Sequence, residues 1–266
     1  MFHLLTIAGS DSSGGAGIQA DLKSFAAHGC FGMSVITSVT AQNTTGVTAI
    51  QNIDPEVVAA QIDAVFTDIR VDGVKIGMVS TSPIIRTIAE KMRQYKPKVL
   101  VVDPVMVATS GAYLLEKDAR TDLIEDLLPL ADLITPNMME GEVLSGLTIR
   151  SKADMEKAAA IILEKGAKGV LLKGGHLAQT ADDYLLTRDG GKWFDGPRYD
   201  NPNTHGTGCS LSSSLAADLA SGMTMEQAVR EAKDYVAMGI KNGLPVGHGH
   251  GPIHHFVTMF KKAGLE

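Results

Sequence analysis

The sequence predicts an α/β fold with a doubly wound, mostly parallel central sheet and helices on both faces. Short apolar runs alternate with helical patterns along the chain of 266 residues, as in repeated βαβ units. Several of the runs, such as 99–102, are continuously apolar, which is typical of parallel strands buried on both faces. No stretch has the composition of an interdomain linker, so we expect a single domain that spans residues 1–266.

The expected strands are short apolar or β-branched runs that end at glycine, proline or polar residues. In chain order they cover residues 4–8, 31–41, 48–53, 73–77, 99–102, 133–135 and 169–173. Two later runs, 184–187 and 192–194, flank an Arg-Asp-Gly-Gly turn and predict a hairpin.

Helical patterns follow most of these strands. Pro55 opens one helix, because proline suits the first helical position, where the missing N–H costs nothing. The expected helices cover residues 18–28, 55–66, 83–94, 116–126, 155–166 and 225–241, and two others start near Asn137 and Thr207.

Composition and charge exclude several classes of function. The content of 44 % apolar and 20 % charged residues is ordinary for a soluble globular protein. A net charge of −6 and the lack of a basic run argue against a nucleic-acid partner. The N-terminus does not read as a signal peptide and no apolar run could span a membrane, so we expect a cytoplasmic protein without membrane contact. Cys30 and Cys209 should then be free thiols.

A glycine-rich turn at residues 203–209 leads into a helix of small and apolar residues. Gly206 and Gly208 let the backbone amides converge, and Thr207 or Ser210 could cap the first turn. Unpaired N–H groups and the positive end of the helix dipole make such a start an anion site. The turn therefore predicts a phosphate position.

Cys209 lies at the same helix start. A helix N-terminus lowers the pKa of a thiol, so this cysteine could act as a base or nucleophile. The alternative is a glycine-rich loop with a buried, inert cysteine.

Polar side chains follow three of the expected strands, where ligands of doubly wound sheets bind. Asn137 and Glu140 could hold a Mg²⁺ ion or its water shell, or could form a capping box at a helix start. Asp103 is either a turn former or a carboxylate that faces metal and phosphates. Lys173 is either a solvated lysine or a cation that neutralises a transferring phosphoryl group.

The loop after the first strand contains G-x-G-x-x-A at residues 15–20, the pattern of a dinucleotide fingerprint. The acidic residue expected about 20 positions later is absent, and a phosphate-binding Walker loop fails because Lys and Ser/Thr are missing. We therefore expect another ligand here. Asp21 could point its carboxylate at a polar small molecule, although a solvated helix position is the default for a lone aspartate.

Taken together, the motifs resemble the hydroxymethylpyrimidine/phosphomethylpyrimidine kinases of the ribokinase superfamily, from about residue 5 to residue 255. The motifs that carry the resemblance are AGSDSSGGAGIQAD at 8–21, TAQNT at 40–44, KIGM at 75–78, DPVM at 103–106, TPN at 135–137 with Glu140, KGGH at 173–176, THGTGC at 204–209 and GPIHH at 251–255.

The resemblance implies a ribokinase-like fold, with ATP and Mg²⁺ as cofactors. The γ-phosphoryl group would pass to the hydroxymethyl of 4-amino-5-hydroxymethyl-2-methylpyrimidine, and a second one to the resulting monophosphate, for thiamine biosynthesis. The amides of residues 206–209 would cradle the transferring group, while Lys173 and the metal near Asn137 and Glu140 neutralise it. Asp103 would face the metal and phosphates. Lys233 would lie near the adenine, although helix periodicity alone places it in solvent.

On the substrate side, Gln42 can both donate and accept hydrogen bonds, which suits an aminopyrimidine edge. The resemblance adds Asp21 and Gly9 to this pocket, with Met78 and Val107 as apolar walls. A homodimer is expected from the family alone.

Alternatives remain open at this stage. Many superfamily members have aspartate where this chain has Cys209, so the thiol is either the base or a residue that shapes the site. Pyridoxal kinase of the same branch is the alternative activity, because its substrate also carries a hydroxymethyl on a heteroaromatic ring, and Gln42 favours pyrimidine. A nicotinamide-dependent oxidoreductase is weakened by the missing ribose-binding acid. A non-catalytic vitamin sensor would not need the phosphate-binding residues.

Overall fold

The structure, a computed structural model, describes residues 1–107, 114–116, 118–175 and 181–265. The described residues form one nine-stranded sheet in the order β3-β2-β1-β4-β5-β6-β7-β8-β9. Neighbours from β2 to β7 pair in parallel, whereas β3, β8 and β9 pair antiparallel at the two edges. The strands are β1 His3–Asp11, β2 Phe31–Asn43, β3 Gly46–Asn52, β4 Gly73–Ile76, β5 Leu100–Val102, β6 Leu133–Ile134, β7 Gly169–Leu172, β8 Asp183–Thr187 and β9 Gly190–Phe194.

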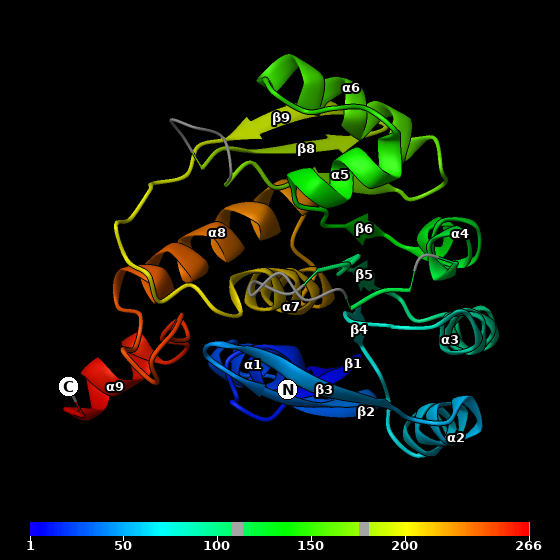
Figure 1. Cartoon of the computed structure of the whole chain (residues 1–266), viewed down its shortest axis with the longest axis horizontal. Coiled ribbons are helices and arrows are strands. Elements are labelled where there is room, and N and C mark those ends of the chain that lie inside the picture. The colour runs from blue at the N-terminus through cyan, green and yellow to red at the C-terminus, as the bar shows by residue number, and fades with distance from the viewer. Residues whose placement is uncertain (108–113, 117, 176–180, 266) are drawn as a thin grey trace.

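Helices cover both faces of the sheet, as expected for a doubly wound fold (Figure 1). Helices α1, α7 and α8 pack on one face, and α2, α3, α4 and α6 on the other. The helices are α1 Gly17–Ala27, α2 Pro55–Phe66, α3 Ser82–Tyr95, α4 Ala119–Asp122, α5 Met138–Ser145, α6 Lys152–Leu163, α7 Thr207–Ala220, α8 Met225–Lys241 and α9 Val257–Ala263.

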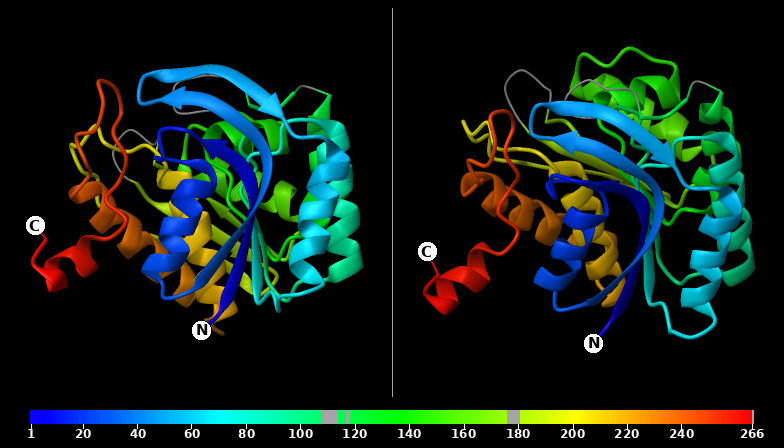
Figure 2. Two further views of the ribbon diagram at one scale, coloured as in Figure 1. Left: turned by 90° about the horizontal axis from the view of Figure 1, so that it is seen from below. Right: turned by 60° about the horizontal axis from the view of Figure 1, so that its bottom comes forward.

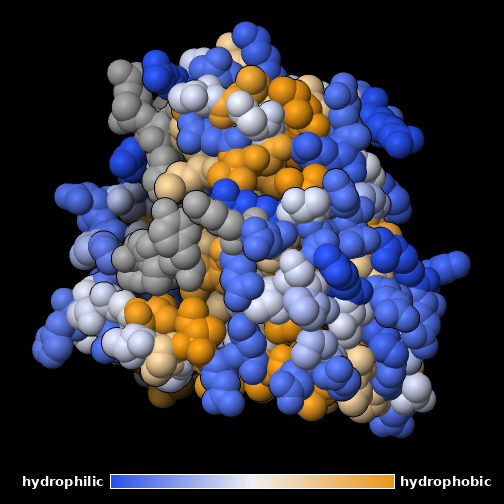
Figure 3. Space-filling view, turned by 45° about the vertical axis from the view of Figure 1, so that its right-hand side comes forward, coloured by the Kyte–Doolittle hydropathy of each residue, from blue (hydrophilic) through white to orange (hydrophobic). Residues whose placement is uncertain are grey.

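The core consists of two large apolar layers, one on each face of the sheet. Helix α3 shows why the sequence folds this way, since Ile84, Ile88 and Met92 are spaced to lie on one face and are buried against the sheet. Arg86 and Glu90 lie on its opposite, exposed face. In Figure 3 the side of the molecule that carries α2, α3 and α4 comes forward. The surface on the right of this view is mostly hydrophilic.

The β2–β3 hairpin continues beyond the rest of the sheet and curls over one end of the molecule (Figure 2). Its turn contacts the loop that follows α8, because the amides of His248 and Gly249 donate to Oγ1 of Thr44 at 3.2 and 3.1 Å. The amide of His250 donates to the carbonyl of Thr44 at 3.1 Å. Hydrogen bonds therefore hold the hairpin turn and the loop after α8 together.

Most expected elements are confirmed, and the late hairpin is β8–β9. The single helix expected at 116–126 is wrong. Helix α4 covers only Ala119–Asp122, and the chain continues as a π turn, Leu123–Leu127, and a 3₁₀ turn, Leu128–Leu130. Pro129 lacks the N–H that a regular helix would need there. The short helix α9 had no expected counterpart.

Among the described residues, no helix is long and apolar enough to cross a membrane.

Candidate active site

The carboxyl ends of the parallel strands open into one cavity of about 580 Å³. This is the edge where ligands of doubly wound sheets are expected. The cavity brings together most of the residues predicted from the sequence, which lie in β1 and β2, follow β4, β5, β6 and β7, or belong to α7, the turn before it, and α8. Its lining includes Gly9, Gln42, Met78, Asp103, Val107, Asn137, Glu140, Lys173, Gly206, Thr207, Gly208, Cys209 and Lys233.

The turn before α7 has the geometry of an anion site. Gly206 is the N-cap residue, with φ of 82°, and a Cβ there would lie 1.9 Å from the carbonyl oxygen of Gly15, so only glycine fits. The expected side-chain cap is wrong: the hydroxyl of Thr207 donates to Thr204 O, and that of Ser210 donates to Gly206 O. Because no side chain caps α7, donors of its first turn remain for a ligand.

A buried cation and carboxylate face this helix start. Nζ of Lys173 lies 3.0 Å from Oδ1 of Asp103, which also accepts from Thr135. Burial alone would lower the pKa of Lys173, but the charges of Asp103 and Glu140 raise it, so the ammonium stays charged. A Cβ on Gly208 would lie 3.4 Å from the ammonium and 3.5 Å from Oδ2 of Asp103. The helix start therefore faces the ammonium of Lys173 and the carboxylate of Asp103 directly.

Asn137 and Glu140 form a capping box at the start of α5, as one of the two interpretations predicted. The Asn137 side chain accepts from the Glu140 amide at 2.9 Å, and Oε2 of Glu140 accepts from the Asn137 amide at 2.8 Å. Burial raises the pKa of Glu140 to about 7. The charge of Lys173 lowers this pKa, whereas the charge of Asp103 raises it further. Both residues still line the cavity, so capping does not remove them from the site.

The expectation of an acidic thiol at Cys209 is wrong for this structure. Burial raises the pKa of Cys209 to about 11, and the opposing charge of Lys75 does not compensate. The carboxylates of Asp21 and Asp103 add to the rise. Desolvation and nearby negative charge therefore outweigh the helix N-terminus, and the thiol is protonated at neutral pH. Cys209 and Cys30 are free cysteines, as expected.

Asp21 does not reach the cavity, which corrects its predicted substrate-binding role. Its carboxylate forms a fully buried ion pair with Lys75 at 2.8 Å and accepts from Ser213 and Thr6. Lys75, not Asp21, lines the cavity. The sequence contained a signal for this pair, because a lysine inside the apolar strand β4 needs a buried carboxylate.

Four of the five residues that the resemblance assigns to substrate binding, Gly9, Gln42, Met78 and Val107, line the cavity. Gly9 leaves no room for a side chain, since a Cβ would lie 2.9 Å from Oγ of Ser38 and 3.0 Å from Sδ of Met78. Met78 and Val107 provide apolar surface, and Gln42 reaches the cavity from the end of β2. These residues come from β1, β2 and the strand-end loops of β4 and β5.

Lys233 lines the cavity from α8, so the solvent-exposed position expected from helix periodicity is wrong. Its side chain is 12 % exposed and pairs with Asp183 at 2.6 Å, and its ammonium also donates to Ala181 O. Asp183 in turn accepts from the amide of Gly174, directly after Lys173. Two of the three N–H groups of the Lys233 ammonium therefore donate hydrogen bonds within the protein.

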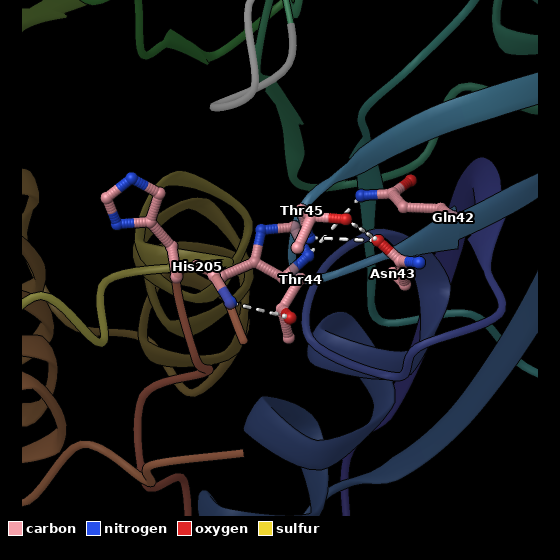
Figure 4. Close-up of a pocket in the computed structure, with 7 residues that line it drawn as sticks. Gln42, Asn43, Thr44, Thr45 and His205 are labelled. Atoms are coloured by element: carbon pink, nitrogen blue, oxygen red, sulfur yellow. Dashed lines mark hydrogen bonds between the residues drawn. The ribbon is translucent and has the colours of Figure 1, made fainter. Parts of the chain in front are cut away.

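Asp11 and His205 are site residues whose roles the sequence reasoning missed. His205 lies next to a smaller pocket of about 400 Å³, shown in Figure 4 with Gln42 and the hairpin residues Asn43 to Thr45 around it. Nε2 of His205 lies 2.9 Å from Oδ2 of Asp11. Both residues stand in the quoted motifs, but sequence spacing could not show that they meet across 194 positions.

His176, which belongs to one of those motifs, lies outside the described residues. The fingerprint-like loop is packed against the turn before α7, and a Cβ on Gly15 would lie 2.2 Å from the His205 ring. The backbone of Gly15 is therefore covered, whereas Ala16 and Gly17 of the same loop line the cavity.

Comparisons with known proteins identify the family. The family model described as phosphomethylpyrimidine kinase matches residues 11–254. The chain belongs to the phosphomethylpyrimidine kinase family. A hydroxymethylpyrimidine/phosphomethylpyrimidine kinase of Rhizobium meliloti is 50 % identical over 261 residues, which cover 97 % of this chain and 98 % of that protein.

Two solved structures support the ribokinase-like fold of this family. A phosphomethylpyrimidine kinase of Clostridium difficile is 48 % identical, with a TM-score of 0.80 over 89 % of this chain and 98 % of its own. A pyridoxal kinase of Bacillus subtilis in complex with ADP is 35 % identical, with a TM-score of 0.90 over 98 % of this chain and 99 % of its own. The higher TM-score accompanies the larger coverage, whereas sequence identity favours the phosphomethylpyrimidine kinase. The protein is a kinase of this family.

Proposed function

We propose that this protein transfers the γ-phosphoryl group of ATP to 4-amino-5-hydroxymethyl-2-methylpyrimidine, and then a second group to the monophosphate. The product would be the diphosphate used in thiamine biosynthesis. Family membership, the relative from Rhizobium meliloti and the ADP complex of the Bacillus subtilis protein support this activity. One 266-residue domain would contain both substrate sites.

The observation that carries the proposal is the position of Gly208 opposite Lys173. A Cβ built there would approach the ammonium at 3.4 Å, so a phosphoryl group in this space would meet helix amides on one side and a cation on the other. Phosphoryl transfer depends mainly on such positioning and charge stabilisation. Gln42 lines the same cavity, where it would contact the pyrimidine.

The side-chain oxygens at the strand ends fit a Mg²⁺ ion that is bound mainly through water and phosphates. Glu140 and Asn137 already use one oxygen each for the capping box, and no cluster of three or more metal-binding side chains occurs in the described part of the chain. Mg²⁺ keeps several waters and commonly binds through one or two carboxylates with substrate phosphates. When bound, it would neutralise phosphate charge, and Glu140 and Asp103 would orient its water shell.

In this site Lys173 would stabilise the charge of the transferring group, and Asp103 would hold its ammonium in place at 3.0 Å. The amide of Thr207 already donates to the carbonyl of Thr204 at 3.2 Å, so the amides of Gly206, Gly208 and Cys209 would donate to the phosphoryl oxygens. Because the thiol of Cys209 is protonated, we propose that it shapes the site and does not remove the hydroxyl proton.

Pyridoxal is the second candidate substrate, since the Bacillus subtilis pyridoxal kinase superposes on nearly the whole chain. The two substrates differ in the edge that would face Gln42. An aminopyrimidine offers an amino donor beside a ring-nitrogen acceptor, which matches an amide.

The test compares turnover of hydroxymethylpyrimidine, its monophosphate and pyridoxal in one ATP-coupled assay. We expect the two pyrimidines to have the higher kcat/KM. Gln42→Met should raise KM for hydroxymethylpyrimidine by about tenfold and spare activity toward pyridoxal, because only the hydrogen-bonding edge is lost. Gln51→Met, on the exposed strand β3 of the same hairpin, is the matched control and should change neither. An unchanged substrate ratio in Gln42→Met would contradict the pocket assignment.

We further propose a cytoplasmic homodimer that contacts neither nucleic acid nor membrane. The net charge of −6 supports the first exclusion. Size-exclusion chromatography with light scattering would measure the oligomeric state directly, and a monomer mass at micromolar concentration would refute the dimer.

A further inference from the structure

Asp11 is a carboxylate that only accepts hydrogen bonds. Oδ1 accepts from the amide and hydroxyl of Ser13, and Oδ2 accepts from the amides of Gly15 and Ala16. Burial alone would raise the pKa of Asp11, but the hydrogen bonds from His205, Ser13 and Ala16 hold it well below its usual range. Asp11 is therefore ionised and offers no proton.

This arrangement decides which nitrogen of His205 carries a proton. Nε2 lies 2.9 Å from Oδ2 of Asp11, and an acceptor-only partner requires an N–H at that position. The same Nε2 lies 3.3 Å from Nε2 of Gln42. With the amide nitrogen of Gln42 toward the ring, its N–H would point at a ring nitrogen whose own N–H donates to Asp11 and which has no free lone pair to accept.

The neighbouring hydroxyl of Thr40 favours the opposite orientation of the amide. Oγ1 of Thr40 lies 2.9 Å from the carbonyl oxygen of Ser10 and 3.1 Å from the terminal oxygen of Gln42. One hydroxyl proton cannot serve two acceptors fully. With the amide turned over, the Gln42 nitrogen donates to Thr40 and Thr40 donates to Ser10. The Nε2–H of His205, which donates to Asp11 at 2.9 Å, then has the Gln42 oxygen as a second, longer acceptor in a three-centre hydrogen bond. Every group then has a partner, which is the criterion by which amide orientation is assigned.

We propose that Asp11 and His205 are positioning residues that hold the Gln42 amide with its oxygen toward the imidazole and its nitrogen toward Thr40. The inference rests on the proposed function, because it takes the aminopyrimidine as the molecule that meets this amide. The free acceptor then lies on the His205 side and the free donor on the Thr40 side. The amino group of the substrate would therefore bind nearest to His205, and its ring nitrogen nearest to Thr40.

The test uses two variants of similar bulk. His205→Met removes the donor, whereas His205→Gln retains an N–H near the position of Nε2. We expect His205→Met to raise KM for hydroxymethylpyrimidine by about tenfold, the effect of one lost hydrogen bond, and to leave KM for ATP within about twofold. His205→Gln should stay within about threefold of wild type for both. Equal effects of the two variants would overturn the proposal.

A double-mutant cycle separates positioning from a merely structural role. If His205 acts through Gln42, then adding His205→Met to Gln42→Met should raise KM for the pyrimidine no further. Additive effects would mean that His205 acts independently, and would refute the inference.

Nitrogen-15 NMR of labelled histidine provides a readout that does not depend on activity. We expect Nε2 of His205 to be protonated in wild type, and an unprotonated Nε2 would refute the inference. Failure of the proposed function would appear separately, as wild-type protein that does not phosphorylate hydroxymethylpyrimidine.

Discussion

The ammonium of Lys75 lies 2.8 Å from Oδ1 of Asp21, and neither side chain has any exposed surface. The pair lies against α7, where Ser213, in the middle of the helix, donates to the same carboxylate at 2.7 Å. Burial alone would lower the pKa of Lys75, but the negative charges of Asp21 and Asp103 raise it above its usual value, so the ammonium stays charged. Removal of one partner would leave an uncompensated buried charge, which is among the most destabilising changes known in proteins.

Asp21→Asn should therefore act mainly on stability. We expect the free energy of unfolding to fall by about 3 to 5 kcal/mol, measured by urea denaturation. Lys168→Gln breaks an ion pair of similar length, 2.6 Å, whose lysine is 73 % exposed, and should cost less than about 1 kcal/mol. Equal losses in the two variants would show that burial does not decide the importance of the Lys75 pair.

Gly208→Val should lower kcat without unfolding the protein. A Cβ at this position would meet Lys173 and Asp103 at 3.4 and 3.5 Å, so the protein has room for it, but it would occupy the proposed phosphoryl position. Displacement of a preorganised donor costs about 10²-fold or more in kcat. The measurement is steady-state turnover together with the melting temperature and KM for the pyrimidine. A variant with normal melting and near-normal turnover would refute the anion site.

Cys209→Ser should retain kcat to within about tenfold, because amides and charge supply most of the acceleration in phosphoryl transfer. The pKa of about 11 means that a thiolate base would make kcat/KM rise with pH far into the alkaline range. We expect the pH profiles of wild type and Cys209→Ser to have the same shape. An alkaline rise that disappears in the serine variant would identify the thiol as the base. In that case Cys209→Asp, with the carboxylate common in the superfamily, should also retain activity.

Asp218, near the end of α7, should make stability depend on pH. Burial raises the pKa of Asp218 to about 6, although Nε2 of His28 lies only 4.0 Å away and acts against the shift. The unfolded chain releases this proton near 3.8 and the folded state near 6, so the folded state binds more protons between these values. This contribution to stability is therefore lost as pH rises through that window.

Asp218→Asn keeps the neutral form at every pH. Its free energy of unfolding, relative to wild type, should increase from about pH 4 to about pH 7. Asp189→Asn makes the same charge change in the exposed turn between β8 and β9 and should not reproduce the trend. Parallel stability curves for wild type and Asp218→Asn would refute the assignment.

Local sequence patterns were sufficient for the layout of the fold. The bounds of α2 and α8 agree with the expected 55–66 and 225–241, since capping residues and apolar spacing are read directly from neighbouring positions. The helix bounds after residue 115 were harder to predict from the sequence, because the π and 3₁₀ turns there depend on packing. Pro129 also interrupts a pattern that is otherwise helical.

Residue type and local spacing predicted the class of fold, the strand ends as the place of the site, and Asp103, Asn137, Lys173 and Gly208 as candidates there, and all four line one cavity. The pairing of Asp21 with Lys75 and the raised pKa of the Cys209 thiol appear only in the folded chain. Ionisation and hydrogen-bond partners depend on desolvation and on charges from distant elements, which no local pattern contains.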